Sequence, residues 1–548
     1  MTSSASLRGA TKQQIAQEDS APMAKLILER EVDPTPAPEF RRDSALRGMS
    51  LRSIEVRLFL TLWVVFLLHV SPYVTREQYL TMALVEKHSV RLDEYADLHP
   101  DLITIPGRGT FLANNPGIAI LAAIPYAVVY PAVRRIAPVR PAPPAENVAA
   151  ETKELRPNRL AFFKKVRERG LDIRLAIVAL FTAGFFMAPL TALSGVLMFR
   201  LIRQLGYATS TALALALLFG LGTPMFFRVA TLSLNLFVAL LGFFGFALLW
   251  WPSGSRPEEK TARYFAAGLL AGWAVVTDYT GVVTLVVLGL FTLALELKDK
   301  PFIRALVDPL WYAAGALGPG LFMLFWQWLC FGNPWKPAQM YWSKSVVGGY
   351  PSPHGFGWPL KEAFWGLIFD PLYGLLVFAP IFVLALYHPV LEWRRTHRVP
   401  GRVAAFAWVF FVALWIFCSC IHYTVRHQWQ DGVRYMVPAL PFLFLLVADV
   451  LAQAPRAVSA LVALAALVET WCLTMVRESP LDSMVKVLLH GLELPWLTTL
   501  VKTAAAYYPP LADGASPIGL LLVAAVVLWG IWRIRDPWRS MSDTQEAQ

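Results

Sequence analysis

Residues 58–70 read LFLTLWVVFLLHV, and residues 73–117 read YVTREQYLTMALVEKHSVRLDEYADLHPDLITIPGRGTFLANNPG. The first stretch is apolar enough to enter a membrane, and a second apolar stretch begins where the quoted segment ends, at Gly117. The segment between them carries six acidic and four basic residues. Such a segment adds nothing to the stability of a membrane-spanning protein, so its carboxylates form either a functional site or a solvated surface.

The composition of the whole chain assigns it to the membrane proteins. Of its 548 residues 56% are hydrophobic and 16% are charged, and the mean hydropathy is +0.49, which excludes an ordinary soluble protein. The net charge of +11 would indicate a nucleic-acid partner in a soluble protein, but here Lys and Arg concentrate in a few connecting segments, as the positive-inside rule predicts. We therefore predict contact with membrane lipids and none with nucleic acid.

The four cysteines indicate neither a disulfide framework nor a zinc site. Cys330, Cys418, Cys420 and Cys472 all lie in or beside apolar stretches and lack the paired spacing of metal ligands. No metal-ligating residue is predicted, and the sequence leaves open whether a divalent cation serves as a cofactor.

The N-terminal residues 1–50 are polar, carry both signs of charge and include the sequence DPTPAPEF. A segment of this composition cannot bury enough apolar surface to fold, so we predict a disordered tail. Because this long polar segment precedes residues 58–70, that stretch is predicted to be a retained signal anchor and not a cleaved signal peptide. The N-terminus is then expected in the cytoplasm.

The second apolar stretch, residues 117–133, is followed by a strongly basic segment. Residues 134–174 contain eleven Lys and Arg against five acidic residues, and the part NRLAFFKKVRERG resembles a basic amphipathic helix at an anionic membrane surface. The positive-inside rule places this segment in the cytoplasm. By alternation, residues 73–116 face the opposite, extracytoplasmic side as an ordered loop.

Further apolar stretches predict an all-α, polytopic transmembrane bundle of about 12 spans (roughly 11–13), with both ends in the cytoplasm. The stretch 264–297 is too long for one straight crossing, and Asp278 and Gly281 in its VTDYTG motif indicate a bend, so we count it as one bent crossing. On this count Arg200 and Arg203 face outward, against the positive-inside rule. We divide the chain into the tail (1–50), a main transmembrane module (51–455), and C-terminal transmembrane helices with a short cytoplasmic tail (456–548). The remaining predicted spans are residues 175–199, 208–225, 231–250, 308–330, 364–387, 402–421, 437–453, 457–475 and 515–533.

Two further segments are expected on the extracytoplasmic side. Residues 331–363, FGNPWKPAQMYWSKSVVGGYPSPHGFGWPLKEA, are rich in Trp, Tyr, Gly and Pro, which suits either an ordered loop whose rings stack on sugars or an aromatic belt at the membrane interface. Residues 422–442, HYTVRHQWQDGVRYMVPALPF, form another polar segment that runs into a span. Ionisable residues near membrane depth tend to be functional.

Several motifs, in their order along residues 55–455, resemble one known family. They are the acidic first loop ending in NNPG, followed by LFGLGTPMFFRVATLSLN, AGLLAGWAVVTDYTG, FGNPW, DPLYGLLVFAP and WQDGVRYMVPALPF. This series is similar to the GT-C superfamily of integral membrane glycosyltransferases, and within it to the protein O-mannosyltransferase and lipid A aminoarabinose transferase branch. The resemblance implies a GT-C-like catalytic module over residues 51–455, a polyprenyl-phosphate-linked sugar donor, and an extracytoplasmic active site in the bacterial cytoplasmic (inner) membrane. The acceptor would be a cell-envelope glycan, lipid or protein.

The resemblance also implies a catalytic acid in the first extracytoplasmic loop. A carboxylate there can take the proton from an acceptor hydroxyl while the sugar leaves its lipid phosphate. The chain lacks the compact pair of acids separated by one residue that many members have, so the choice stays open among four candidates. We rank Asp101 first because it lies closest before the PGRG turn, and the others are Asp97, Asp93 and Glu94.

A leaving phosphate needs cations, and the planar fork of Arg suits it better than Lys. We predict that the donor phosphate is bound by Arg108, Arg434 and Arg426, with Lys336 and Lys344 as secondary candidates. For each of these residues the competing interpretation is contact with lipid headgroups or solvent.

Two other functions fit the same pattern. A flippase or transporter of lipid-linked sugars would share the spans, and would place charged residues near the middle of the bilayer together with internal repeats. A glycan polymerase or ligase that uses the same carrier lipid would rely on Arg and on His422, His427 and His354 in the outer loops. Release of a labelled sugar from a lipid-phosphate donor separates these functions.

Overall fold

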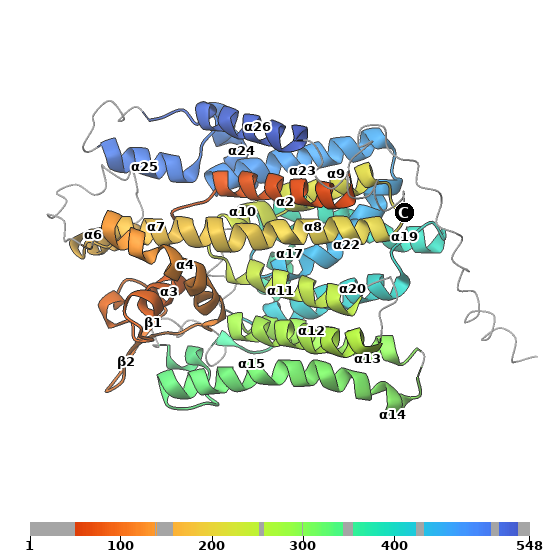
Figure 1. Cartoon of the computed structure of the whole chain (residues 1–548), viewed down its shortest axis with the longest axis horizontal. Helices are drawn as coiled ribbons and strands as arrows, with labels where there is room; N and C mark the ends of the chain where they lie inside the picture. Colours follow the sequence, from red (N-terminus) through yellow and green to blue (C-terminus); the bar gives the residue numbers. More distant parts are fainter. Residues whose placement is uncertain are drawn as a thin grey trace, which may run out of the picture.

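The computed structural model describes residues 50–137, 139, 157–250, 257–298, 300–342, 355–422, 432–505 and 514–534. Over these residues the chain is almost entirely helical, with one two-stranded sheet, and the predicted all-α helical bundle is confirmed (Figure 1). Five helices are long and apolar enough to cross a membrane, and the bent pair Pro480–His490 and Pro495–Val501 would make a sixth. The predicted tail, residues 1–50, lies outside the described residues except for Ser50.

The first described helix, α2 (Leu51–Leu68), defines the two ends of the bundle. Its N-terminus is capped by the Ser50 hydroxyl, which accepts from Ser53 N at 3.2 Å. We call the end at which α2 begins, marked by Glu55, the proximal end, and the end at which α2 finishes the distal end. Arg57 donates to the carbonyl oxygens of Trp532 and Ile534, so the last described helix, α26 (Ile518–Arg533), also finishes at the proximal end.

One long helix connects the two ends. α7 (Asp172–Thr182), a π-helical turn (η3, Ala183–Met187) and α8 (Ala188–Gln204) form a continuous apolar helix of 33 residues. At about 1.5 Å per residue it is roughly 50 Å long, which exceeds the ~30 Å hydrocarbon core of a bilayer. Near its C-terminus Arg200 forms a two-pronged ion pair with Glu55, at 2.8 and 2.6 Å. The helix therefore ends at the proximal end and begins at the distal end.

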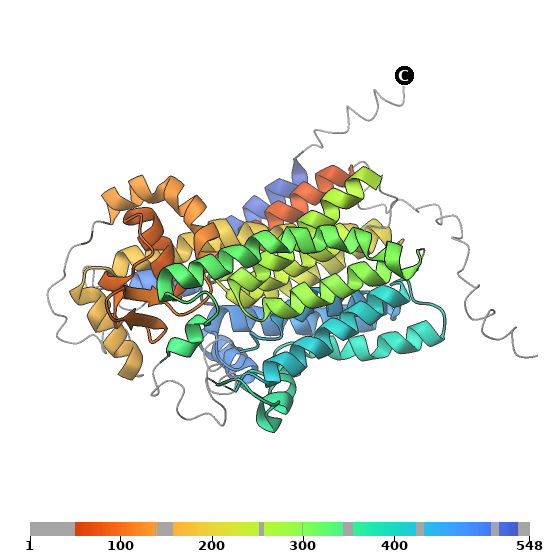
Figure 2. The same cartoon turned by 90° about the horizontal axis from the view of Figure 1, so that it is seen from below.

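A layer of short elements covers the distal end, and both views show it gathered beyond that end of the bundle (Figures 1 and 2). The two strands pair antiparallel, with Leu102 opposite Leu112, and a tight turn joins them. The elements of this layer are α3 (Glu77–Glu86), η2 (Asp93–Tyr95), β1 (Leu102–Ile105), β2 (Gly109–Leu112), α4 (Gly117–Ile136) and α6 (Pro157–Glu168).

The described part of the basic segment after the second apolar stretch, residues 157–174, lies in this same layer, so its predicted position on the side opposite residues 73–116 is wrong. Arg169 donates to the carbonyl oxygens of Glu94 and Ala96, both at 2.9 Å, and Lys165 donates to that of Asp97 at 3.3 Å. These two cations bind backbone carbonyl oxygens of the first loop. At least these two cations therefore dock the basic segment onto the first loop.

The helix α4 is apolar but does not lead to the proximal end. Its first residue, Gly117, packs against the backbone of Thr277, and the carbonyl oxygen of Ala137, just after its end, accepts from Arg174. Arg174 lies in the first turn of the long helix and pairs with Glu86 at 2.8 Å. Because Arg174 is 26 residues before Arg200 on one continuous helix, it lies about 39 Å from the proximal end. Both ends of α4 therefore belong to the distal half.

The predicted single bent crossing at residues 264–297 is also wrong, because the chain forms a helical hairpin there. α12 (Pro257–Thr277) and α13 (Gly281–Glu296) run antiparallel, and the Tyr264 hydroxyl near the start of one donates to Glu296 at the end of the other, at 2.7 Å. Asp278 makes the turn by accepting from the amide and hydroxyl of Thr280, at 2.9 and 2.6 Å. The VTDYTG motif does interrupt the helix, as predicted. The chain reverses its direction there and does not continue in the same direction.

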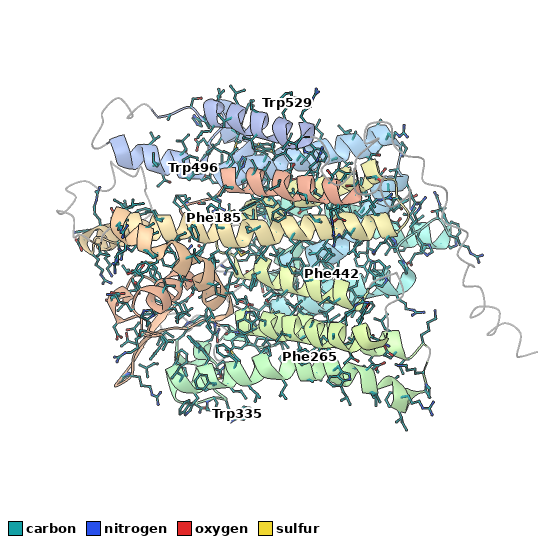
Figure 3. The ribbon with its side chains drawn as sticks, viewed as in Figure 1. Phe185, Phe265, Trp335, Phe442, Trp496 and Trp529 are labelled. Atoms are coloured by element: carbon teal, nitrogen blue, oxygen red, sulfur yellow. The ribbon has the colours of Figure 1, made fainter. Side chains whose placement is uncertain are left out.

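The rest of the bundle packs around an aromatic core. Phe442 is fully buried and contacts Phe246, Phe406 and Phe410, whereas Phe185, Phe265 and Trp529 face outward (Figure 3). Outward apolar rings on a helical bundle are typical of a membrane protein. The remaining elements are α9 (Thr209–Leu221), α10 (Met225–Val229), α11 (Leu234–Leu249), α14 (Phe302–Ala305), α15 (Val307–Phe331), η4 (Ala338–Tyr341), α17 (Lys361–Phe369), α18 (Leu375–Phe378), η6 (Pro380–Tyr387), α19 (His388–Trp393), α20 (Gly401–Ser419), η7 (Val437–Ala439), α22 (Leu440–Gln453), α23 (Arg456–Val476), α24 (Pro480–His490) and α25 (Pro495–Ala505).

Candidate functional site

The site is built around Arg76, the residue just before α3. Its Nε donates to Glu77 at 2.8 Å, and its Nη1 donates to Asp101. With the amide oxygen of Asn114 turned toward the guanidinium, Asn114 accepts from Nε at 2.7 Å. Three acceptors from separate parts of the distal layer thus converge on one cation, and the Asp101 and Glu77 side chains are only 11% and 3% exposed.

The hairpin explains why Asp101 and Asn114 meet, although thirteen positions separate them. Asp101 directly precedes β1 and Asn114 follows β2, and the register of the two strands brings these positions to the open end of the hairpin. Ala113 N donates to Asp101 O at 2.8 Å and extends the pairing to this point. The first turn of α3 then supplies the cation and Glu77. The site is therefore fixed by backbone pairing and not by the loop side chains alone.

Arg76 remains charged at its partly buried position. Burial alone would lower its pKa, but the carboxylates of Asp101 and Glu77 outweigh that effect and hold the pKa above its ordinary value. Two carboxylates and one guanidinium give the cluster a net negative charge in a buried place. Removing Arg76 would leave both carboxylates without their shared partner, which is far costlier than losing an exposed ion pair.

His99 supports Asp101 from the other side. Its Nδ1 accepts from Asp101 N at 3.1 Å and lies 3.8 Å from Asp101 Oδ2. Burial lowers the pKa of His99, and the neighbouring Asp101 only partly opposes this. The imidazole is therefore neutral near pH 7, in the tautomer that leaves Nδ1 free to accept.

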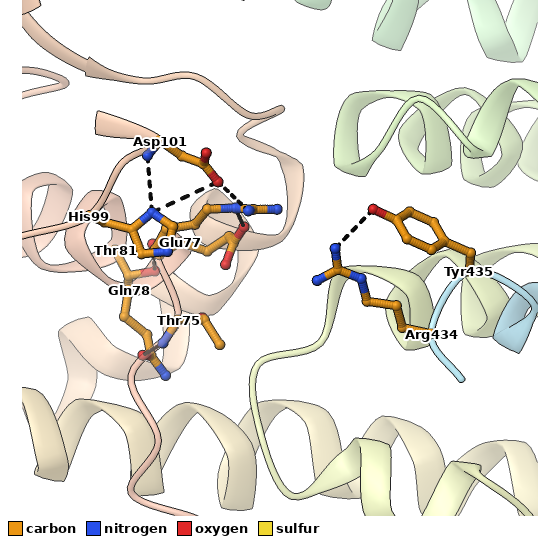
Figure 4. A network of polar contacts seen from close by, with 9 residues as sticks. Thr75, Glu77, Gln78, Thr81, His99, Asp101, Arg434 and Tyr435 are labelled. Carbon is orange, nitrogen blue, oxygen red and sulfur yellow. Dashed lines mark hydrogen bonds and ion pairs between the residues drawn. The ribbon is translucent and has the colours of Figure 1, made fainter. Parts of the chain in front are cut away.

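A second group of side chains, Arg434 and Tyr435, faces this cluster. Figure 4 shows the Arg434 guanidinium and the Tyr435 hydroxyl directed toward the side on which Asp101, His99 and Glu77 lie. Arg434 Nη2 donates to the Tyr435 hydroxyl at 2.9 Å, and its guanidinium lies 4.8 Å from the ring centre. Arg434 Nε is buried and has no hydrogen-bond partner in the described part of the chain. One donor of this cation is thus left unsatisfied by the described residues.

The electrostatics connect the two groups. Burial raises the pKa of Tyr435, Arg434 lowers it, Asp278 raises it, and Arg76 lowers it from across the site. Asp278 belongs to the turn between α12 and α13, and this turn lies beneath the NNPG motif, where Asn115 Nδ2 donates to Val275 O at 2.6 Å. The first loop, the α12–α13 turn and the segment before η7 therefore meet at one place at the distal end.

Of the four predicted catalytic acids, only Asp101 lies in the buried cluster. Asp93 accepts from Thr110 N at 2.6 Å and pairs with Arg91 at 3.0 Å, so it braces the hairpin with a half-exposed carboxylate. Glu94 faces Lys87 at 3.6 Å and is 42% exposed. Asp97 is exposed and adopts a left-handed backbone conformation at φ 64°. The structure thus separates one enclosed acid from three at the surface.

The predicted phosphate-binding arginines have different surroundings. Arg108 lies in the turn between the strands and donates to the carbonyl oxygens of Trp328 and Leu329, at 3.5 and 3.3 Å, where it complements the C-terminus of α15. It shares no partner with Arg434 in the contacts of the described residues. Arg426 lies outside the described residues, as do Lys344, His354 and His427.

Two other candidates from the outer loops are described. Lys336 lies 4.1 Å from the ring centre of Tyr341, and His422 Nε2 is 2.8 Å from the carbonyl oxygen of Trp358. Within the described ranges no group of three or more His, Cys, Asp or Glu side chains could hold a metal ion.

The residues that sequence reasoning missed are Arg76, Glu77, Asn114 and Tyr435. Arg76 and Glu77 follow the first span directly in the motif TREQ, and Asn114 belongs to the NNPG motif, so both motifs contained the signal.

No family model matches the chain, and neither the curated proteins nor the solved structures compared with it include a match. The site therefore stands on its own geometry.

Proposed function

We propose that the chain is a membrane glycosyltransferase of the GT-C type, which moves a sugar from a polyprenyl-phosphate donor to an extracytoplasmic acceptor. The observation that carries this proposal is the buried cluster of Asp101, Arg76 and Glu77 facing Arg434 and Tyr435 at one end of an apolar helical bundle. A carboxylate and a cation with an unsatisfied donor, enclosed together, are the groups that transfer from a lipid phosphate requires.

The proposed topology has twelve crossings, with both ends of the chain in the cytoplasm. This topology leaves α4 out of the crossings and counts the α12–α13 hairpin as two crossings. The contacts of the helix ends support it, because successive crossings then run alternately from the proximal to the distal end and back. The crossings are α2, α7 with α8, α9, α11, α12, α13, α15, α17 to α19, α20, α22, α23 and α26.

The proximal end is assigned to the cytoplasm because its short connections are basic. Lys300 lies between α13 and α15 at this end, and three arginines lie between α19 and α20. Arg200 and Arg203 then also face the cytoplasm, which removes the conflict that the earlier count created. The distal site is extracytoplasmic in the cytoplasmic membrane of a bacterium. The three arginines between α19 and α20 are Arg394, Arg395 and Arg398, and Arg402 lies in the first turn of α20.

Each side chain has a definite role in the proposed reaction. The acceptor hydroxyl oxygen attacks the anomeric carbon, its proton passes to Asp101, and the bond between that carbon and the phosphate oxygen breaks. Arg76 holds the Asp101 carboxylate in place. Arg434 stabilises the charge that develops on the departing polyprenyl phosphate through charge-assisted hydrogen bonds. Asp101 is thus the proposed catalytic base and Arg434 the proposed phosphate ligand.

The cluster's position favours transfer over transport. A flippase or transporter is expected to hold its substrate near the middle of the bilayer, whereas this cluster lies in the layer beyond the distal helix ends. A polymerase or ligase that relied on the outer histidines would use His422, which instead contacts a backbone carbonyl at Trp358.

The experiment uses purified full-length protein and polyprenyl phosphates that carry labelled hexoses or pentoses. We expect release of sugar from the donor by the wild type, and a loss of about 100-fold in Arg434→Lys, which keeps the charge but loses the fork. Arg108→Lys is the matched control, because Arg108 contacts helix carbonyls, and it should keep its activity. A fully active Arg434→Lys, or no release from any donor, would contradict the proposal.

A further inference from the structure

A groove of about 490 Å³ lies at the proximal end, far from the candidate site. Its volume falls within the ~300–1,000 Å³ typical of sites for small ligands. The floor is apolar, and three charged side chains stand at its proximal end. The groove is lined by Leu193, Val196, Leu197 and Arg200 of α8, by Phe244, Ala247 and Leu248 of α11, and by Glu259 and Arg263 of α12.

The groove opens to the side of the bundle. Leu193 is 47% exposed, and it belongs to one of the long apolar helices that can cross a membrane. The nearby Phe265, on the outer face of α12, is 42% exposed. An apolar groove that opens beside such a helix faces hydrocarbon in a bilayer, so a lipid chain is the ligand that can enter it from the side.

The charged side chains at the proximal end of the groove, which we call its mouth, balance one another. Arg200 pairs with Glu55 at 2.6 Å, and Arg263 donates through Nε to Leu248 O at 2.7 Å, which holds its guanidinium at the groove. Glu259 precedes Arg263 by one helical turn and is exposed. Two arginines and two glutamates give a mouth with no net charge. Such an arrangement complements a zwitterionic headgroup better than an anionic one.

We propose that this groove binds a zwitterionic aminophospholipid of the phosphatidylethanolamine type. One acyl chain packs along Leu197 and Phe244, the phosphate accepts from Arg263, and the primary ammonium donates to Glu259. A choline headgroup has no N–H to donate, and a glycerol headgroup adds a net negative charge beside Glu259. The site is independent of the proposed transfer reaction at the other end of the bundle.

The test is native mass spectrometry of the purified, delipidated full chain with equal amounts of phosphatidylethanolamine, phosphatidylcholine and phosphatidylglycerol. We expect the wild type to retain phosphatidylethanolamine about tenfold better than the other two, and Arg263→Gln to lose that advantage. Glu259→Gln should bind the ethanolamine and choline lipids equally. Arg304→Gln is the matched control, because Arg304 is exposed at the same end and does not line the groove.

A second variant separates loss of the site from loss of the fold. Ala247→Phe fills the groove from its apolar floor and should reduce retention of all three lipids while the elution volume and melting temperature stay close to those of the wild type. Equal retention of the three lipids by the wild type, or preferred retention of phosphatidylglycerol, would overturn the proposal. So would phosphatidylethanolamine retention that neither Arg263→Gln nor Ala247→Phe reduces.

Discussion

Arg76 is the residue on which the distal layer depends most. Replacing it with Gln leaves Asp101 and Glu77 buried without their shared cation, and we expect a loss of roughly 3 kcal/mol in the free energy of unfolding. Arg91→Gln is the matched control: its pair with Asp93 is half exposed, so its removal should cost less than ~1 kcal/mol. Denaturant unfolding of the detergent-solubilised protein measures both. Equal losses in the two variants would show that Arg76 is an ordinary surface cation.

His99 makes the stability of this layer depend on pH. The pKa of His99 in the folded protein lies below 6.5, its ordinary value in the unfolded chain. At a pH between the folded and the unfolded pKa, the unfolded chain therefore binds a proton that the folded chain does not. Folding stability should therefore be complete above pH 6.5 and fall as the pH drops below it.

The variant His99→Asn tests this directly, because an amide oxygen can replace Nδ1 as the acceptor for Asp101 N and does not titrate. We expect the wild-type melting temperature to fall more steeply than that of His99→Asn from about pH 7.5 to about pH 5. Parallel curves for the two proteins would refute the role given to His99.

At this scale the sequence predicted Asp101 and Arg434 but not their partners. Asp101 was ranked first from its place before the PGRG turn, and it is the candidate acid that lies in the buried cluster. Arg76 and Asn114 could not be paired with it from the sequence, because the pairing arises from the strand register and the start of α3. Arg108 was predicted to bind the donor phosphate because it precedes the second apolar stretch on the expected extracytoplasmic side, yet its hydrogen bonds among the described residues are with α15.

At the scale of elements, α12 and α15 pack closely because glycines line their contact. A Cβ on Gly315 would lie 2.0 Å from Phe265 O, and one on Gly268 would lie 1.9 Å from Tyr312 O. We therefore expect Gly315→Ala to lower the free energy of unfolding by about 1–3 kcal/mol through overpacking. Gly320→Ala on the same helix meets nothing within 4 Å, so it should be neutral or slightly stabilising. Thermal unfolding followed by tryptophan fluorescence distinguishes them, and a destabilised Gly320→Ala with an unchanged Gly315→Ala would contradict this packing.

Hydropathy alone could not predict the arrangement of two elements. The helix α4 is long and apolar like a span, but its buried positions face α3 and α7 in the distal layer, and apolar periodicity does not tell protein from lipid. The stretch 264–297 has the composition of one long span, and only the contact of Tyr264 with Glu296 shows that it folds back. The proposed topology leaves α4 out and counts the hairpin as two crossings, so its count of twelve equals the count predicted from the sequence.

At the scale of the whole molecule, the topology predicts which segments share a side of the membrane. In a chain without its native cysteines, Lys87→Cys in the first loop and Ala161→Cys in α6 should both react with an impermeant thiol reagent on intact cells. Thr396→Cys, in the basic connection between α19 and α20, should react only after permeabilisation. All three positions are exposed, so differences in burial do not explain the pattern. Labelling of Ala161→Cys together with Thr396→Cys, and not with Lys87→Cys, would contradict the distal layer.

The central claim is that Asp101 is the base of an extracytoplasmic sugar transfer, and one comparison of amide variants tests it most directly. Transfer of labelled sugar from polyprenyl phosphate is measured for the wild type, Asp101→Asn, Asp93→Asn and Asp97→Asn, with insertion and melting temperature checked for each. We expect a loss of at least ~100-fold in Asp101→Asn, the scale of a lost general base, and near-normal transfer in Asp93→Asn and Asp97→Asn. Normal transfer by a folded Asp101→Asn, or loss confined to Asp93→Asn or Asp97→Asn, would contradict this claim.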